Sequence, residues 1–153
     1  AGKPAKFMRW TTMADEHVHV EFHLDPDLAL VGVLRGAVQF QALNAGLMPE
    51  TGEAVAGASE AICRESLNRL AEEDGGLDVS LDTFADRIEV SILHRGEPAP
   101  VVGLDRFAVP DIPSKCVGGM NGRELLSRVD RVLYRNEDGK VRTTLVKFRK
   151  SAK

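Results

Sequence analysis

The stretch HVHVEFHL at residues 17–24 decides the fold, because its side chains alternate strictly between two kinds. The apolar set is Val18, Val20, Phe22 and Leu24. The polar set is His17, His19, Glu21 and His23. A period of two over eight residues predicts a strand with one buried and one exposed face. Such a strand requires a second layer of structure on its apolar side.

Two helices are predicted directly after this strand. Asp25 is suited to cap the first helix, with Pro26 at its first position, and helical periodicity continues to about Gly46. Pro49 opens the second helix, which is expected to run to about Asp74, before two glycines. Its buried stripe is predicted to consist of Val55, Ala58, Ile62, Leu67 and Leu70.

Two further pairs of strands are predicted. Residues 77–84 and 87–93 alternate on either side of Ala85-Asp86, which is typical of an antiparallel hairpin with one covered face. Residues 132–135 and 141–148 flank a turn that contains the dipeptide Asp-Gly.

The segment between the two hairpins has no periodicity. It covers residues 96–122 and is rich in proline and glycine, and a short helix is predicted after it at residues 123–131. A connection of this length usually forms a functional lid or a disordered segment. The order of elements predicts an α+β fold, a two-layer α/β sandwich whose mixed or antiparallel sheet is covered by helices on one face.

The composition fits one domain. The chain has 153 residues, of which 43% are hydrophobic and 28% charged, and its formal net charge is -3. This balance argues against binding to nucleic acid or to a membrane surface, which requires a concentrated basic face. We divide the chain into an N-terminal extension at 1–16, a single domain at 17–150 and a tail at 151–153. The first residues of the extension could precede a native start at Met8 or Met13.

The cysteines and the terminal sequence indicate the compartment. Cys63 and Cys116 lack metal-ligand spacing and do not form a disulfide framework. The N-terminus has no apolar segment typical of a secretory signal, and no apolar run is long enough to span a bilayer. We therefore expect a soluble, cytoplasmic protein.

The polar set at residues 17–24 is a candidate metal site. Residues two apart on a strand lie about 6.5–7 Å apart and project together, so two histidines could share a zinc ion. No cysteine accompanies them, however, and the sequence identifies no ligand from a second strand. We therefore favour a solvated polar face and predict no metal.

Cys63 and His94 are a second candidate pair, as nucleophile and base. Cys63 lies next to the apolar stripe of the second helix, whereas catalytic cysteines need an exposed, electropositive setting. Cys63 is therefore predicted to be a small buried hydrophobe.

Glu60 and Arg64 form the third candidate. They lie four residues apart on the second helix, in the orientation that favours a surface ion pair. Their context is Ser59-Glu60-Ala61-Ile62-Cys63-Arg64. This segment resembles the N box of the anti-sigma factor serine kinases, which belong to the histidine-kinase-like (GHKL) ATPase superfamily. The usual sequence of that box is Ser-Glu-Ala, followed by two further residues and then Asn. The order of elements over about 17–150, including a long lid before a short helix, is similar as well.

The resemblance assigns roles to both residues. In the family the N-box Glu acts as general base, which corresponds to Glu60, and the Asn ligates the Mg²⁺ that bridges the phosphates. Arg64 stands in place of that Asn. An arginine has only donors and cannot ligate a cation. It could contact a phosphate directly, or it could simply neutralise Glu60.

Two further nucleotide boxes correspond to later segments. The family has Asp-x-Gly-x-Gly, whose Asp binds the adenine amino group, where this chain reads His94-Arg95-Gly96-Glu97-Pro98. Gly96 is retained, and His94 would take the place of the Asp. The third box corresponds to Gly119, Asn121 and Gly122, which could present N–H groups to phosphate or could belong to a loop before a helix.

The resemblance implies an anti-sigma regulatory factor that acts by protein–protein binding, with weakened or lost ATP binding. Its partner would be a sigma factor or an anti-sigma antagonist domain, and a homodimer is a further option. The alternative is an active ATP-dependent serine/threonine protein kinase that uses ATP and Mg²⁺, with Glu60 as base and Arg64 on the γ-phosphate. A third interpretation is a metal-binding or structural domain that uses the strand histidines.

Overall fold

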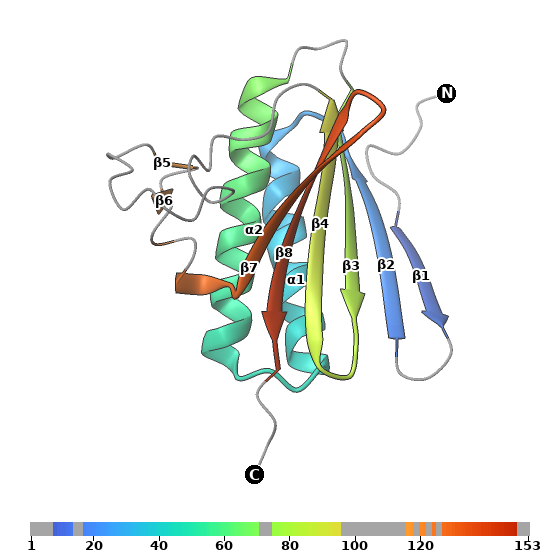
Figure 1. The fold of residues 1–153 in the computed structure, drawn as a ribbon, viewed down its shortest axis with the longest axis vertical. Helices are drawn as coiled ribbons and strands as arrows, with labels where there is room; N and C mark the ends of the chain where they lie inside the picture. Colours follow the sequence, from blue (N-terminus) through green and yellow to red (C-terminus); the bar gives the residue numbers. More distant parts are fainter. Residues whose placement is uncertain are drawn as a thin grey trace.

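The computed structural model describes residues 8–13, 17–70, 75–95, 116–117, 120–121, 124 and 127–149. They form a six-stranded sheet, in the order β1-β2-β3-β4-β8-β7, with two long helices on one face (Figure 1). The elements are β1 (Met8–Met13), β2 (His17–Leu24), α1 (Leu28–Asn44), α2 (Pro49–Arg69), β3 (Leu77–Thr83), β4 (Arg87–Arg95), β7 (Arg131–Glu137) and β8 (Lys140–Phe148). A separate two-stranded pair consists of β5 (Cys116–Val117) and β6 (Met120–Asn121).

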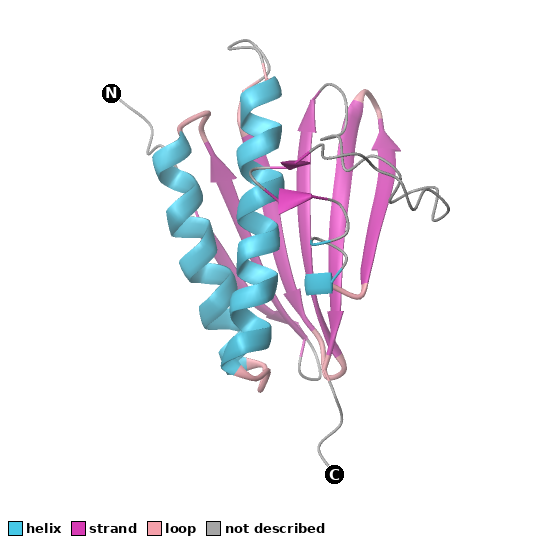
Figure 2. Cartoon of the chain, turned by 90° about the vertical axis from the view of Figure 1, so that its left-hand side faces the viewer, coloured by secondary structure: helices cyan, strands magenta, loops and turns pink. Residues whose placement is uncertain are grey.

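The layers agree with the sequence prediction. Figure 2 shows both helices lying against one face of the sheet, so the predicted α+β, two-layer arrangement is confirmed. Every neighbouring pair of strands in the large sheet is antiparallel. Of the two predicted options, mixed or antiparallel, the structure therefore has the second.

Strand β1 was not predicted. It pairs with β2 in a register that runs from Met8 opposite Phe22 to Met13 opposite His17. The sequence of β1 lacks a clean alternation of apolar and polar residues. Its extended conformation therefore follows from hydrogen bonding to β2 rather than from a pattern of its own. Part of the predicted N-terminal extension thus belongs to the sheet.

The start of α1 differs from the prediction by two residues. Asp27, not Asp25, is the N-cap: it has an extended backbone, and its carboxylate accepts a hydrogen bond from the Ala29 N–H at 2.9 Å. Pro26 therefore precedes the cap instead of opening the helix. The predicted end is confirmed, because Gly46 follows the helix with φ of +87°, a conformation that favours glycine.

The structure ends α2 at Arg69, with Leu70 as an extended C-cap, and the predicted continuation at 71–74 lies outside the described residues. Pro49 opens the helix as predicted. The predicted stripe is confirmed, since Val55, Ala58, Ile62 and Leu67 are buried and Leu70 is partly buried.

Both predicted hairpins are present. In the first, the Phe84 N–H donates to the Arg87 carbonyl at 2.8 Å across Ala85-Asp86. In the second, the turn is only Asp138-Gly139, with φ of +50° and +79°. Two positive φ values match the tight turn that Asp-Gly favours, and they let β7 and β8 extend up to the turn.

The prediction of a short helix at 123–131 extends too far at its C-terminal end. Of that range Glu124, Ser127 and Arg128 are described as helical, and Arg131 already belongs to β7, opposite Val146. The predicted unstructured segment at 96–122 lies mostly outside the described residues, apart from β5 and β6.

The core lies between the helices and the sheet. It consists mainly of aliphatic side chains, including Val20, Leu24, Val31, Leu34, Val38, Ile62, Leu81, Ile92 and Leu145. The apolar set of β2 faces this layer, which leaves its polar set on the opposite face. Among the described helices, none combines the length and apolar character needed to cross a membrane.

Truncation of a core leucine on α1 tests this arrangement. Leu34 is fully buried and Leu43, on the same helix, is 45% exposed. We expect Leu34→Ala to lower the free energy of unfolding by about 2–5 kcal/mol, because it leaves a cavity in a close-packed layer. Leu43→Ala should cost less than about 1 kcal/mol. Urea denaturation followed by circular dichroism measures both, and equal losses would contradict the described packing.

Candidate functional site

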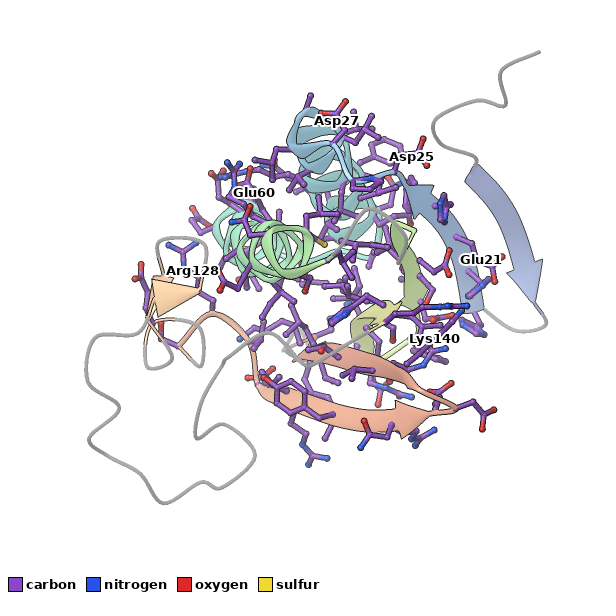
Figure 3. All side chains as sticks on the ribbon, turned by 90° about the horizontal axis from the view of Figure 1, so that it is seen from above. Glu21, Asp25, Asp27, Glu60, Arg128 and Lys140 are labelled. Atoms are coloured by element: carbon purple, nitrogen blue, oxygen red, sulfur yellow. The ribbon has the colours of Figure 1, made fainter. Side chains whose placement is uncertain are left out.

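Glu60 lies at the centre of an ionic cluster that joins the two helices. Its Oε1 accepts a hydrogen bond from Nη1 of Arg35 on α1 at 2.7 Å, and its Oε2 accepts one from Nη2 of Arg64 at 3.1 Å. Arg35 also donates to Oε1 of Glu53 at 2.8 Å. We call Arg35, Glu53, Glu60 and Arg64 the Glu60 cluster. Figure 3 shows Glu60 on the outer side of the helical layer, away from the sheet.

The cluster changes the acidity of Glu60. Burial raises the pKa of its carboxyl, but hydrogen bonds from Arg35 and Arg64, together with their charges, outweigh burial and lower the net pKa below its usual value. Glu60 is therefore a weaker base than an ordinary glutamate, and each of its oxygens already has a donor. A general base needs a lone pair within hydrogen-bond reach of its substrate, and the arginines occupy two of the about four lone-pair sites of this carboxylate. In this arrangement Glu60 is an ion-pair partner.

Arg64 forms the ion pair with Glu60 that is one of the two options the sequence left open. Its side chain is 42% exposed and donates to Glu60. One of its guanidinium nitrogens, Nη2, is engaged in this way among the described residues, 3.1 Å from Oε2 of Glu60. Arg35 was missed by sequence analysis because it is 25 residues from Glu60 along the chain. As the only charged residue in α1, it was nevertheless a visible anomaly.

His94 lies near the end of β4, on the side that faces the helices. It is only 2% exposed, and its Nδ1 lies 2.9 Å from the Arg95 carbonyl oxygen. Since a carbonyl accepts, Nδ1 carries the proton, and in the neutral ring Nε2 holds the lone pair. Nε2 is buried and has no hydrogen-bond partner among the described residues.

The cavity beside His94 is small. It measures about 260 Å³ and is lined by His23, Gly75, Gly76, Asp78, Leu93, His94, Arg95 and Lys140. Ligand pockets usually measure about 300–1,000 Å³. The lining has four charged or histidine side chains besides His94 and a single large apolar side chain, which is more polar than an adenine site requires.

The remaining predicted nucleotide positions are only partly described. Gly96, Gly119 and Gly122 lie outside the described residues. Asn121 belongs to β6, where it pairs with Cys116. Of these positions the structure thus describes Asn121 alone, on a strand pair whose strand β5 contacts α2.

A basic residue contacts α2 one helical turn before Glu60. A Cβ atom added at Gly57 would lie 2.5 Å from Nη1 of Arg128, so a side chain there would displace the guanidinium. Figure 3 shows Arg128 beside α2 on the flank that faces away from α1. Sequence analysis missed this contact, although a glycine inside a long helix can indicate a close approach.

Cys63 is fully buried in the core beneath Glu60. Burial, and then the charge of Glu60, raise the pKa of its thiol far above its usual range. A thiol in this state is neither ionised nor accessible. The predicted role as a small buried hydrophobe is confirmed.

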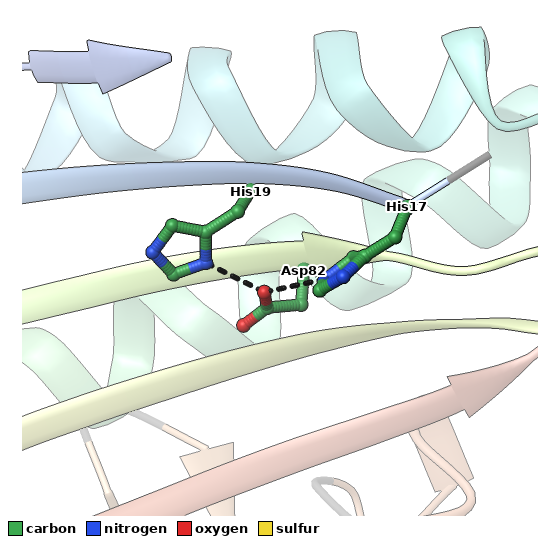
Figure 4. A group of neighbouring side chains, drawn as sticks. All are labelled: His17, His19 and Asp82. Carbon is green, nitrogen blue, oxygen red and sulfur yellow. Dashed lines mark hydrogen bonds and ion pairs between the residues drawn. The ribbon is translucent and has the colours of Figure 1, made fainter. Parts of the chain in front are cut away.

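A second cluster lies on the open face of the sheet. Nε2 of His17 and Nδ1 of His19 lie 2.8 Å and 2.6 Å from the same oxygen, Oδ1 of Asp82 on β3 (Figure 4). Nε2 of His19 lies 3.0 Å from Oε1 of Glu21. The antiparallel register places Asp82 directly opposite His19. A carboxylate from a second strand, which the sequence could not identify, therefore lies beside the two histidines.

His19 has a carboxylate at both ring nitrogens. Burial lowers its pKa, but the hydrogen bonds to Glu21 and Asp82, with the charges of those residues, outweigh burial and raise the net pKa above its usual value. His23 is separate from this group and lies 2.8 Å from Oδ1 of Asp78. The polar set of β2 is thus divided into a histidine pair with a shared carboxylate and an independent ion pair.

No model of a known protein family matches this sequence, and a search of curated proteins finds no match. The residues and contacts described above are therefore the basis for inferring a function.

The lowered pKa of Glu60 predicts a pH dependence of stability. At pH 7 the free energy of unfolding of the protein with Glu60 should exceed that of Glu60→Gln by about 1–2 kcal/mol, because of the charged hydrogen bonds. In the acid range the unfolded chain binds the proton of Glu60 more readily than the folded chain does. This gain should therefore be present above the unfolded pKa, near 4.5, and disappear as the pH falls through the lower folded pKa.

Urea denaturation at pH 7 and at a pH well below 4.5 measures this difference. The exposed Glu50, which has no ion-pair partner in the described part of the chain, is the matched control on the same helix. Glu50→Gln should show a much smaller change between the two pH values. An equal gain at both pH values for Glu60 would show that its two arginines do not stabilise its charged form.

Proposed function

We propose that this chain is a regulatory protein of the anti-sigma type on a histidine-kinase-like ATPase fold, which acts by binding another protein and has weakened or lost ATP binding. The observation that carries this proposal is the Glu60 cluster. Both oxygens of the expected base accept hydrogen bonds from arginines, at 2.7 Å and 3.1 Å.

The cluster also disfavours a magnesium ion beside Glu60. Mg²⁺ requires oxygen ligands in near-octahedral geometry. The position of the expected Asn ligand holds Arg64, and Arg35 adds a second guanidinium at the same carboxylate. A divalent cation there would meet two like charges within a few ångströms. Phosphotransfer through Glu60 would thus require both ion pairs to open first.

His94 supports weakened rather than absent nucleotide binding. Its buried Nε2 has no partner among the described residues, so it could accept a hydrogen bond from an amino group. A single neutral acceptor beside a small, polar cavity provides little binding free energy compared with a full set of phosphate and metal contacts. Affinity for ATP should therefore be low and independent of Mg²⁺.

The outer face of α1 supports the protein-binding part of the proposal. Leu28, Val33, Phe40 and Leu43 are between 41% and 55% exposed. The one charged residue of this helix, Arg35, is already paired with Glu53 and Glu60. An uncharged apolar face that carries an exposed aromatic side chain is typical of a protein-binding surface.

Two exposed glycines on α1 also support a protein-binding surface on this helix. A Cβ atom added at Gly32 or Gly36 would meet nothing within 4 Å, so packing inside the protein does not require either glycine. Each glycine inside a helix costs roughly 0.5–1 kcal/mol relative to alanine. Close approach of a partner's backbone gives a reason for this cost. A sigma factor or an anti-sigma antagonist domain is the partner that the resemblance implies.

Thermal unfolding with nucleotides tests the first part of the proposal. We expect MgATP and MgADP at millimolar concentration to leave the Tm unchanged, because only a ligand that binds the native state raises it. Arg64→Asn should restore the metal ligand and produce a Tm increase that depends on Mg²⁺. If MgATP raises the Tm of the unvaried protein, and Glu60→Ala abolishes phosphotransfer to a serine substrate, the kinase alternative is correct.

Substitution on α1 tests the second part. The sigma factors and antagonist domains of the source genome, purified one by one, would be titrated calorimetrically with this protein. We expect one of them to bind, and Phe40→Asp to weaken that binding about tenfold or more, as for a central interface residue. The control is Leu133→Asp, since Leu133 is equally exposed, at 54%, but lies on β7. Absence of any binding, or unchanged binding by Phe40→Asp, would contradict the proposal.

A further inference from the structure

We propose that His17, His19 and Asp82 form a binding site for a divalent transition-metal ion such as Zn²⁺, on the face of the sheet opposite the helices. One ligand atom from each residue lies within 4.8 Å of the others. Figure 4 shows the two rings and the carboxylate converging from β2 and β3. This site is independent of the proposed anti-sigma function, since it uses no residue of the Glu60 cluster and none of the predicted nucleotide positions.

The geometry of the three groups is close to that of a metal complex. Zinc binds imidazole nitrogen and carboxylate oxygen at about 2.0–2.2 Å, which separates neighbouring ligand atoms by roughly 3.4 Å in a tetrahedron. The nitrogens of His17 and His19 now lie 2.8 Å and 2.6 Å from Oδ1 of Asp82. Rotation of the three side chains about their χ angles would adjust these separations around an ion.

The surrounding residues hold both rings in place. Glu21 accepts a hydrogen bond from Nε2 of His19 at 3.0 Å, which leaves Nδ1 as the ligand atom once a metal replaces its proton. A carboxylate on the outer nitrogen of a metal-binding histidine is a common device for fixing its orientation. The ring of Phe84 stacks on His17, with centroids 4.2 Å apart and planes at 16°. The orientation of each ring is therefore fixed by a different neighbour, Glu21 for His19 and Phe84 for His17.

The ligand set indicates which metals would bind. Two imidazoles and one carboxylate suit Zn²⁺, Ni²⁺ or Cu²⁺, whereas Mg²⁺ and Ca²⁺ prefer oxygen ligands alone. The three side chains are about one fifth exposed, at 23%, 23% and 19%, so an ion can enter from solvent. Three protein ligands leave a fourth position of a tetrahedral ion for water.

A third histidine of strand β2, His23, can be compared with His17 and His19. His23 lies 2.8 Å from Asp78 and 3.5 Å from Asp25, but among the described residues it has no pair of further ligand atoms within 4.8 Å of it and of one another. The described residues contain one group that meets the distance condition for three ligands, and His23 is not part of it. His23 therefore provides the matched control for a test.

Calorimetric titration of the purified, untagged chain with ZnCl₂ tests the proposal, after removal of metals with EDTA and dialysis. We expect one Zn²⁺ per chain, an increase in the Tm with Zn²⁺, and no effect of Mg²⁺. Co²⁺ should give the visible absorption bands of a four-coordinate site, a signal that a general effect on stability would not produce. Absence of saturable Zn²⁺ binding would overturn the proposal.

Variants assign the site to its residues. His17→Gln, His19→Gln and Asp82→Asn should each weaken Zn²⁺ binding at least about 100-fold, and Glu21→Gln about 10-fold, as for an outer partner. His23→Gln should bind Zn²⁺ as the unvaried protein does. Circular dichroism would confirm folding, and if Asp82→Asn does not fold, the two histidine variants decide. Equal losses in His19→Gln and His23→Gln would overturn the proposed site.

Discussion

One sheet face must be covered by a single layer of two helices, and the rest of the structure depends on this constraint. The apolar side chains of β2, β3, β4 and β8 meet those of α1 and α2 in an aliphatic core that contains Leu34, Ile62 and Ile92. Because the sheet has helices on only one side, its other face is left to polar residues. The helices likewise have an outer surface on the side away from the sheet. The Glu60 cluster and the apolar face of α1 lie on that outer surface, and the histidine pair lies on the open sheet.

The Glu60 cluster stabilises the packing of the two helices and at the same time makes Glu60 less suited to accept a proton. Arg35 holds Glu60 and Glu53 of the neighbouring helix with one guanidinium, so it fastens α1 to α2. The same hydrogen bonds lower the basicity of Glu60 and occupy its oxygens. A residue suited by sequence to accept a proton is thereby suited by structure to hold two helices together. A partner or ligand that draws Arg35 away from Glu60 and Glu53 would break this link, which would couple its binding to the packing of α1 on α2.

Local patterns predicted most of the elements. Alternation over 17–24, helical spacing after Pro49 and the Asp-Gly dipeptide were sufficient, because each acts through neighbouring residues. The predictions failed where two neighbouring residues could both cap a helix, or where a strand has no hydrophobic pattern. Asp25 and Asp27 are both suitable caps, and the hydrogen bond to Ala29 selects Asp27. Strand β1 has no alternation of its own, and pairing with β2 makes it a strand.

The fold class, the buried stripe of α2 and the inert character of Cys63 follow from periodicity and hydrophobicity, so they could be predicted from the residues alone. The contacts of the polar candidates became clear only from the three-dimensional arrangement. Glu60 meets Arg35 across 25 residues, and His19 meets Asp82 across 63. An ion pair or a metal ligand depends on separations of about 2–4 Å, and local sequence patterns do not determine distances between segments far apart in the chain. Helix packing and strand register set those distances, and with them the chemistry available to this protein.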